Sequence, residues 1–294
     1  MKLPDFELVR PTSLDDAVDA MGSYGDEAAV LAGGQSLLLE MRYGERTPGV
    51  LVGLNRVPRL DALRVESDAL RIGPRVRHAH VADPPESSGA LGRLMARMAP
   101  YVAHPPVRSR GTFAGSLAWG HPCAEWCALA GLTDAEMTLR DGAGTRTVTA
   151  SAWFRGDRRT ARRPDEVLVE VALPLLPADA GVGFVEHRRS HASFALVAAL
   201  AALTLDDEGL VADARLAVAG AADVPLRAVE AEQVLVGRSP DPTALRAAAV
   251  AAAQESDPVN EPLCSADYRR HAVEVVSRRT LEAALADVPA GRRS

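Results

Sequence analysis

The chain has 294 residues, 47% of them hydrophobic, which is enough for two domains with sizeable cores. Its formal net charge of −6 argues against a nucleic-acid-binding surface, because such a surface needs a concentrated basic face. The three cysteines, Cys123, Cys127 and Cys264, are an odd number without C-x₂-C repeats, so they support neither a disulfide framework nor a zinc site. No apolar run approaches the roughly 18 residues of a membrane span, and Met1–Arg10 lacks the pattern of a secretory signal. We therefore expect a cytoplasmic protein without a membrane span.

The N-terminal part of the chain predicts a small α/β unit followed by antiparallel strands. Apolar residues recur at helical spacing after Ser13, whereas the short apolar run Ala28–Leu31 favours a buried strand. In chain order the predicted elements are a helix that Ser13 begins and Gly22 and Gly25 end, a strand over Ala28–Leu31, a helix over Leu37–Tyr43, a strand over Val50–Leu54 and a hairpin of Leu63–Val65 with Leu70–Ile72.

The rest of the chain predicts more antiparallel strands and a helical C-terminal end. The predicted central elements are a helix over Ala90–Ala103, a helix that starts near Pro122, a hairpin of Met137–Arg140 with Thr145–Val148 and a strand over Val167–Leu173. The turn-rich residues 206–209 then favour a hairpin of Phe194–Leu205 with Leu210–Gly220, although its alanines favour helix. Three helices are predicted over Leu226–Val236, Pro242–Gln254 and Ala266–Ala286.

Two residues of possible catalytic interest, His78 and His80, follow the first hairpin. On a strand, a spacing of two would point both side chains to one face, which suits a metal ion or an acid–base pair. No further ligand cluster accompanies them, and paired surface histidines are ordinary, so we favour a role without chemistry and expect no metal site.

Two loops of small residues carry the strongest functional signal. The first is Leu31-Ala-Gly-Gly-Gln-Ser36, which follows the predicted strand directly, and the second is Val107–Ser116. Glycines allow positive φ and remove the Cβ atom, so successive N–H groups can surround an anion. A tight strand-to-helix connection is the alternative for either loop alone. Together, the two loops could hold one pyrophosphate.

These loops, at this separation, resemble the flavin-binding medium subunit of the molybdenum hydroxylases, the group that includes carbon monoxide dehydrogenase and xanthine dehydrogenase. The family pattern is approximately A-G-G-x-S in the first loop, and R-N-R-G-T-I-G-G-S/N followed by P-x-A/S-D/E in the second. The matching segments here are Ala32–Ser36, Arg108–Ser116 and Pro122–Glu125. The resemblance continues through Phe154, residues 164–168, Arg188-Arg189 and residues 265–270, and so covers nearly the whole chain.

The resemblance implies an α+β fold and bound FAD. It implies a two-subdomain FAD-binding domain of the vanillyl-alcohol-oxidase (PCMH-like) type over residues 1–176, divided into about 1–55 and 56–176. A C-terminal domain with a small antiparallel sheet and helices would follow over residues 177–294. The implied cofactor-binding residues are Leu31, Ala32, Gly33, Gly34, Gln35, Ser36, Gly111, Thr112, Gly115, Ser116, Glu125 and Leu168.

Some positions depart from the family pattern around the flavin ring. Phe113 and Ala114 replace a branched apolar residue and a glycine, and residues 119–121 replace a small polar run. If position 114 needs positive φ, alanine there costs on the order of 1 kcal/mol, and the local turn differs. A lysine frequent shortly before Arg188-Arg189 is also absent, with Val185-Glu186-His187 there instead.

The residues show no self-contained catalyst, such as a P-loop, H-E-x-x-H or G-x-G-x-x-G, so the flavin is expected to be the reactive group and no catalytic side chain is assigned. The resemblance implies an electron-transfer subunit that passes electrons from [2Fe–2S] clusters of a small subunit to an acceptor, with substrate oxidised at molybdopterin in a large subunit. Two alternatives stay open: a free-standing FAD-dependent oxidase or monooxygenase on the same fold, and a flavin-free binding scaffold. The arginine-rich segment Arg155–Arg163 either docks an acidic partner or is a solvated loop.

Overall fold

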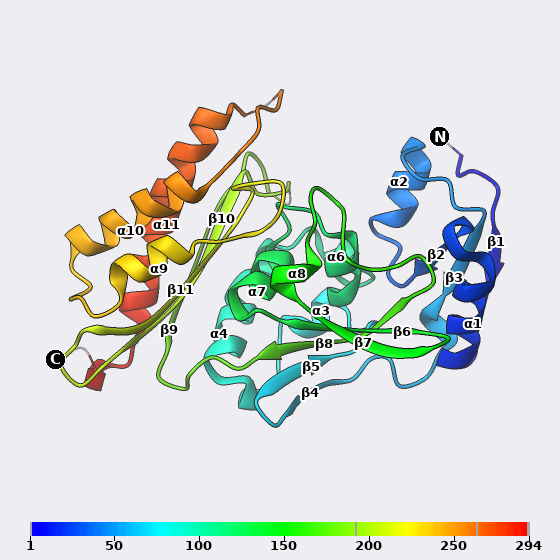
Figure 1. Ribbon diagram of the computed structural model, residues 1–294, viewed down its shortest axis with the longest axis horizontal. Helices are drawn as coiled ribbons and strands as arrows, with labels where there is room; N and C mark the ends of the chain where they lie inside the picture. The colour runs from blue at the N-terminus through cyan, green and yellow to red at the C-terminus, as the bar shows by residue number, and fades with distance from the viewer. Residues whose placement is uncertain (1, 192, 263, 293–294) are drawn as a thin grey trace.

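The computed structural model describes residues 2–191, 193–262 and 264–292. The described residues form three β-sheets that follow one another along the long axis of the molecule, each with its own helices (Figure 1). The mixture of a parallel sheet, two antiparallel sheets and separate helices is an α+β fold, as the sequence predicted.

The N-terminal residues form a parallel sheet of order β1-β3-β2, from β1 (Glu7–Val9), β2 (Ala28–Leu31) and β3 (Val50–Gly53). Helix α1 (Leu14–Tyr24) begins at a capping box of Ser13 and Asp16 and buries Ala17, Val18 and Met21 against this sheet. Helix α2 (Leu37–Tyr43) follows β2 after the first glycine loop. The sequence predicted all of these elements except β1, whose three residues carry no alternating pattern of their own.

The middle of the chain forms an antiparallel central sheet of order β4-β5-β8-β6-β7. Its strands are β4 (Leu63–Glu66), β5 (Ala69–Ile72), β6 (Glu136–Asp141), β7 (Gly144–Thr149) and β8 (Val167–Pro174). The accompanying helices are α3 (His78–Val81), α4 (Gly89–Met98), α5 (Pro105–Arg108), α6 (Phe113–Trp119), α7 (Glu125–Thr133) and α8 (Ala150–Trp153). Phe113, Trp126 and Trp153 are fully buried in the core between these helices and the sheet.

The C-terminal sheet has the order β12-β11-β10-β9, and all its pairs are antiparallel. Its strands are β9 (Gly181–His187), β10 (Val197–Leu205), β11 (Val211–Ala219) and β12 (Leu226–Arg227). Its helices are α9 (Val229–Leu235), α10 (Pro242–Glu255) and α11 (Ala266–Asp287), and they cover one face of the sheet (Figure 1). The opposite face packs on α4 and α7. Helix α7 therefore connects the core of the central sheet with the C-terminal sheet.

Two details of the C-terminal sheet differ from the sequence prediction. The helix expected over Leu226–Val236 begins only at Val229, because Leu226 and Arg227 pair with β11 as a short edge strand. Strand β9 was not predicted at all. The alanine-rich hairpin of β10 with β11 was predicted and is confirmed, since it is buried between two layers where packing overrides helix propensity.

Candidate functional site

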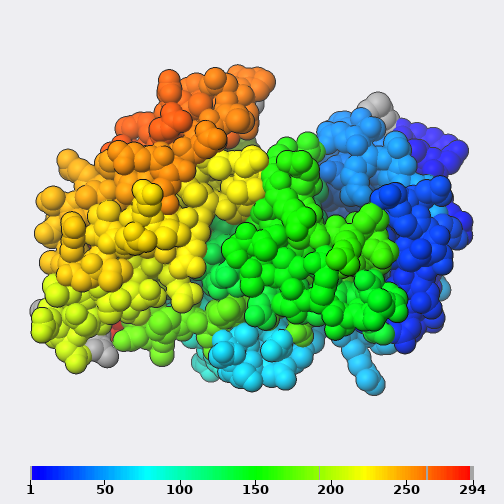
Figure 2. Space-filling view, viewed as in Figure 1, coloured from blue at the N-terminus to red at the C-terminus, as the bar shows by residue number. Residues whose placement is uncertain are grey.

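A cleft of about 700 Å³ lies between the parallel sheet and the helices of the central sheet. This volume is in the range of roughly 300–1,000 Å³ that is usual for sites of small molecules and cofactors. Its walls are the loop between β2 and α2, the segment that leads from α5 into α6, the start of α7, and parts of the 157–162 and 193–194 segments. In the space-filling view the blue N-terminal part of the molecule lies beside the green middle part of the chain (Figure 2).

The first glycine loop presents free backbone donors to this cleft. Within the described part of the chain, the N–H groups of Gly33, Gly34, Gln35 and Ser36 donate to no acceptor, although these residues line the cleft. Gly34 has φ of +72°, a conformation that favours glycine. Consecutive unpaired N–H groups around such a residue are suited to an anion such as a phosphate.

The second loop packs directly on the first. A Cβ atom on Gly33 would lie 2.5 Å from the Arg110 carbonyl oxygen and 2.7 Å from the Gly111 Cα atom. Gly33 is therefore required for the close approach of the two loops. The sequence interpretation had given a different reason for the glycines, namely that they let successive N–H groups surround an anion.

The second loop ends in helix α6, whose N-cap is Thr112. The Thr112 hydroxyl accepts a hydrogen bond from the Gly115 N–H at 3.0 Å, so this side chain is used to fix the loop. Ala114 lies inside α6 and has no positive φ, so the strain considered for an alanine at this position is absent. Arg108 donates to the carbonyls of Val102 and Ala103, at 3.1 and 2.7 Å, and thereby holds the preceding turn.

All of the cofactor-binding residues expected from the sequence line the cleft except Leu31, whose side chain packs with the small apolar cluster beside α2. Leu168 reaches the cleft from β8 and Glu125 reaches it from the first turn of α7. The structure thus gathers residues from four separate segments of the chain at one place.

The surroundings of Glu125 favour the protonated form of its carboxyl group. It is only 5% exposed, and burial together with the neighbouring Glu186 raises the pKa of its carboxyl group to about 8. Its carboxyl group therefore binds a proton more readily than that of an exposed glutamate. Sequence reasoning did not find Glu186, because strand β9 was not predicted and its face could not be assigned.

The cleft is lined by a group of aromatic side chains that the sequence did not place together. The His121 ring stacks on Trp119 and on Phe194, with centroid distances of 4.8 and 4.5 Å. The Trp119 indole N–H donates to a carboxylate oxygen of the buried Glu40, on α2, at 2.7 Å. This hydrogen bond joins helices α2 and α6 across the cleft. Glu40 and Phe194 are site residues that sequence reasoning missed, since neither belongs to a recognisable motif.

His78 and His80 lie on helix α3 and not on a strand, so they do not share a face. His78 is buried, and its Nδ1 atom accepts a hydrogen bond from the Trp126 indole at 3.1 Å. Burial, and then the positive charges of Arg108 and Arg77, lower the pKa of His78 to about 4. His78 is therefore a neutral packing residue, and among the described residues no group of three or more potential ligands is arranged to hold a metal ion.

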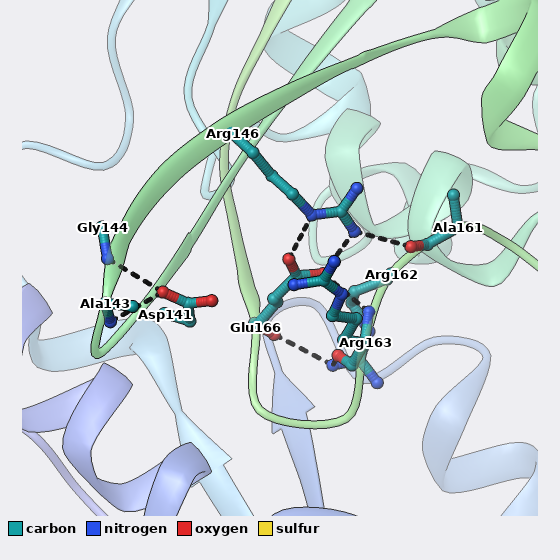
Figure 3. Close-up of polar contacts among 8 residues, drawn as sticks. All are labelled: Asp141, Ala143, Gly144, Arg146, Ala161, Arg162, Arg163 and Glu166. Carbon is teal, nitrogen blue, oxygen red and sulfur yellow. Dashed lines mark hydrogen bonds and ion pairs between the residues drawn. The ribbon is translucent and has the colours of Figure 1, made fainter.

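The arginine-rich segment is partly used within the chain itself. Arg158 forms ion pairs with Glu45 and Glu40, at 2.7 and 3.7 Å, and so ties the segment to the α2 region. Arg162 donates to three nearby backbone carbonyls, including that of Glu166 at 2.9 Å. Glu166 in turn accepts hydrogen bonds from Arg146 and from the Arg163 N–H, as Figure 3 shows. These contacts leave less of the segment's charge for a partner than the sequence suggested.

Comparisons with known proteins agree with this architecture. Residues 4–176 match the family model of the FAD binding domain in molybdopterin dehydrogenase, and residues 183–284 match that of the CO dehydrogenase flavoprotein C-terminal domain. No helix among the described residues is long and apolar enough to cross a membrane.

Individual relatives cover nearly the full length. The 6-hydroxypseudooxynicotine dehydrogenase complex subunit alpha of Paenarthrobacter nicotinovorans is 34% identical over 97% of this chain and 96% of its own. The nicotine 6-hydroxylase medium subunit of the same organism is 34% identical over 96% of this chain and 98% of its own. A solved structure of carbon monoxide dehydrogenase from Hydrogenophaga pseudoflava is 32% identical, superposes with a TM-score of 0.94, and covers 98% of this chain and 100% of the matched chain. With its two glycine loops meeting at a cofactor-sized cleft, this chain therefore belongs to the FAD-binding subunits of the molybdenum hydroxylase family.

Proposed function

We propose that this protein is the FAD-carrying electron-transfer subunit of a molybdenum-dependent hydroxylase or dehydrogenase complex. In this complex a large subunit with molybdopterin oxidises the substrate, and a small subunit with [2Fe–2S] clusters passes the electrons on. FAD in this chain accepts them and transfers them to a small-molecule acceptor. The observation that carries the proposal is the cleft at which the free N–H groups of the first loop meet the second loop.

FAD is proposed to bind without a covalent bond, because neither loop contains a histidine or cysteine as an attachment point. The backbone of Ala32–Ser36 would hold the pyrophosphate through the unpaired N–H groups of the first loop, with Thr112–Ser116 packed beside it and no competing negative charge in either loop. Glu125 and Leu168 also line the cleft, where by resemblance to the family Glu125 would hydrogen-bond the nucleotide part of FAD and the backbone of Leu168 would be near the adenine. Bound FAD supplies the two-electron chemistry, and the protein binds it, orients it and limits its exposure to water.

The chain depends on partners for its electrons. Its three cysteines are all buried and free, whereas an iron–sulfur cluster needs a clustered set of cysteine thiolates. Relatives described as a subunit of a dehydrogenase complex and as a medium subunit support a multi-subunit assembly. The free thiols also fit a reducing compartment, and we assign the protein to the cytoplasm.

We also assign two domains to the chain. Residues 1–176 form the FAD-binding domain, with subdomains of about 1–55 and 56–176, and residues 177–294 form the C-terminal domain. The ranges matched by the two family models and the separate core beneath the C-terminal helices support this division.

The deciding experiment is to purify the protein from its native host and to record its visible spectrum and metal content. We expect a flavin spectrum, FAD that is released intact on denaturation, and co-purifying subunits that contain iron and molybdenum. Turnover of a small organic substrate by the isolated chain, with oxygen or NAD(P)H alone, would instead establish a free-standing flavoenzyme. Failure to bind FAD in a titration would establish a flavin-free scaffold.

A further inference from the structure

Two buried carboxyl groups from different parts of the fold meet beside the cleft. Glu125 is the first residue of α7, and it lines the cleft. Glu186 lies on β9, and its side chain is 0% exposed. Side chains alternate between the faces of a strand, so Glu186 shares its face with Val182 and Phe184, which pack in the core of the central sheet. An acidic residue thus occupies an apolar interface, directly opposite another acidic residue.

The surroundings of this pair favour a proton on it. Each carboxyl group affects the pKa of the other, and two ionised carboxylates held together away from water would repel each other. In the described part of the chain, neither oxygen of Glu186 accepts a hydrogen bond from any ordinary donor. The nearest cation is Arg188, whose Nη1 atom is 3.5 Å from Glu186 Oε1. The Arg188 guanidinium also lies over the Tyr101 ring at 4.9 Å, which holds it in place.

The summed charge of this cluster also favours one proton on the carboxyl pair. Two carboxylates and one guanidinium sum to zero only if the carboxyl pair carries one proton. The other titratable groups that face Glu125 are the thiols of Cys123 and Cys127; burial raises the pKa of Cys123 to about 12 and that of Cys127 well above its ordinary value. Both thiols are therefore neutral.

Burial places the titration of the pair near neutral pH. It raises the pKa of Glu125 to about 8 and that of Glu186 to about 7, although Arg188 opposes the rise at Glu186. Because the two groups interact strongly, these values belong to the pair and not to either residue. A small change in nearby charge is then enough to load or unload the proton.

We propose that Glu125 and Glu186 share one proton and exchange it with water whenever the charge of the FAD beside them changes. When FAD gains electrons, its added negative charge favours the protonated pair, so the pair takes up a proton from water; when FAD is reoxidised, the proton returns to water. Only an O–H bond forms or breaks at the carboxyl pair. The coupling is electrostatic, and it is strong because both carboxyl groups are shielded from water. Glu186 is a positioning residue here, since it acts through Glu125. The inference rests on the proposed position of FAD in the cleft.

The shared proton is tested by infrared spectroscopy of the purified full-length protein. We expect the carbonyl band of a protonated carboxylic acid at neutral pH, which shifts in D₂O and disappears in both Glu125→Gln and Glu186→Gln. Glu166→Gln is the matched control. Glu166 is also buried, but hydrogen bonds from Arg146 outweigh its burial and lower its pKa, so its removal should leave the band unchanged. A band that survives in either variant of the pair overturns the shared proton.

The coupling is tested by the midpoint potential of bound FAD over a pH range that brackets 7 and 8, where the pair titrates. We expect the wild-type potential to change its slope with pH in this range, and both glutamine variants to lack that change. The same change of slope in both variants would overturn the coupling. A protein that binds no FAD would refute the proposed function, while the infrared result on the carboxyl pair would still stand.

Discussion

Replacing Gly33 with alanine tests whether the contact between the two loops forms the cofactor site. The added Cβ atom would lie 2.5 Å from the Arg110 carbonyl oxygen, whereas ordinary contacts begin at 3.4 Å, so the loops must separate by about 0.9 Å. Overpacking of this kind typically costs about 1–3 kcal/mol. If this amount is added to the free energy of the FAD-bound state, the dissociation constant of FAD rises about 5- to 140-fold, at 1.4 kcal/mol for each factor of ten.

Fluorescence titration of FAD into the cofactor-depleted protein measures this effect. Gly49→Ala is the matched control: Gly49 lies in the same N-terminal part of the chain, and a Cβ atom there would meet nothing within 4 Å. We expect the control to bind FAD like the wild type. Equal affinities of Gly33→Ala and Gly49→Ala would refute the argument that the loops must touch to hold the cofactor.

Three further predictions concern stability, each measured by urea unfolding. The pKa of His78 in the folded protein is about 4, below the ordinary 6.5, so its contribution to the free energy of unfolding is present above pH 6.5 and is lost as the pH falls toward 4. Acidification over this range should lower the free energy of unfolding of the wild type by up to about 3 kcal/mol, and that of His78→Gln by clearly less. Trp119→Phe keeps an aromatic ring but removes the hydrogen bond to Glu40, and should lower the free energy of unfolding by about 1–3 kcal/mol. An unchanged urea midpoint would contradict this. Arg146→Met removes the arginine that pairs with the buried Glu166 and should lower the free energy of unfolding by about 3–5 kcal/mol. The double variant Arg146→Met/Glu166→Met should recover part of this stability. If it recovers none, the ion pair is not the cause of the loss.

Much of the fold could be predicted from the sequence, because most elements carry a local pattern. The hairpin of β6 with β7 is bounded by a turn and alternates in polarity, and the prediction is confirmed. Strand β1 was missed because its three residues are defined only by their pairing with β3, some forty residues later in the chain. Strand β9 was missed because Gly181 and Gly183 interrupt one of its faces and Glu186 interrupts the other.

The candidate site was predictable in part. The small residues of the two loops lie in recognisable motifs, and the cleft that they line could be expected from their spacing and the family resemblance. Their contacts with FAD stay a prediction. Glu40 and Glu186 could not be found in the same way. Their roles depend on partners such as Trp119, which is 79 residues from Glu40 in the sequence, and on burial that only the folded chain creates.

The hydrogen bond between Trp119 and Glu40 has a consequence for how the holoprotein assembles. The cleft has one wall in the parallel sheet unit and the other in the central unit, and this bond and the Arg158 ion pairs with Glu40 and Glu45 link the two walls directly. A ligand that contacts both walls stabilises their docked arrangement by mass action, in proportion to the logarithm of its free concentration. Insertion of FAD and docking of the N-terminal unit are therefore a single coupled equilibrium. Starving the cell of flavin would loosen that end of the molecule first, and would expose it to proteases before the C-terminal sheet.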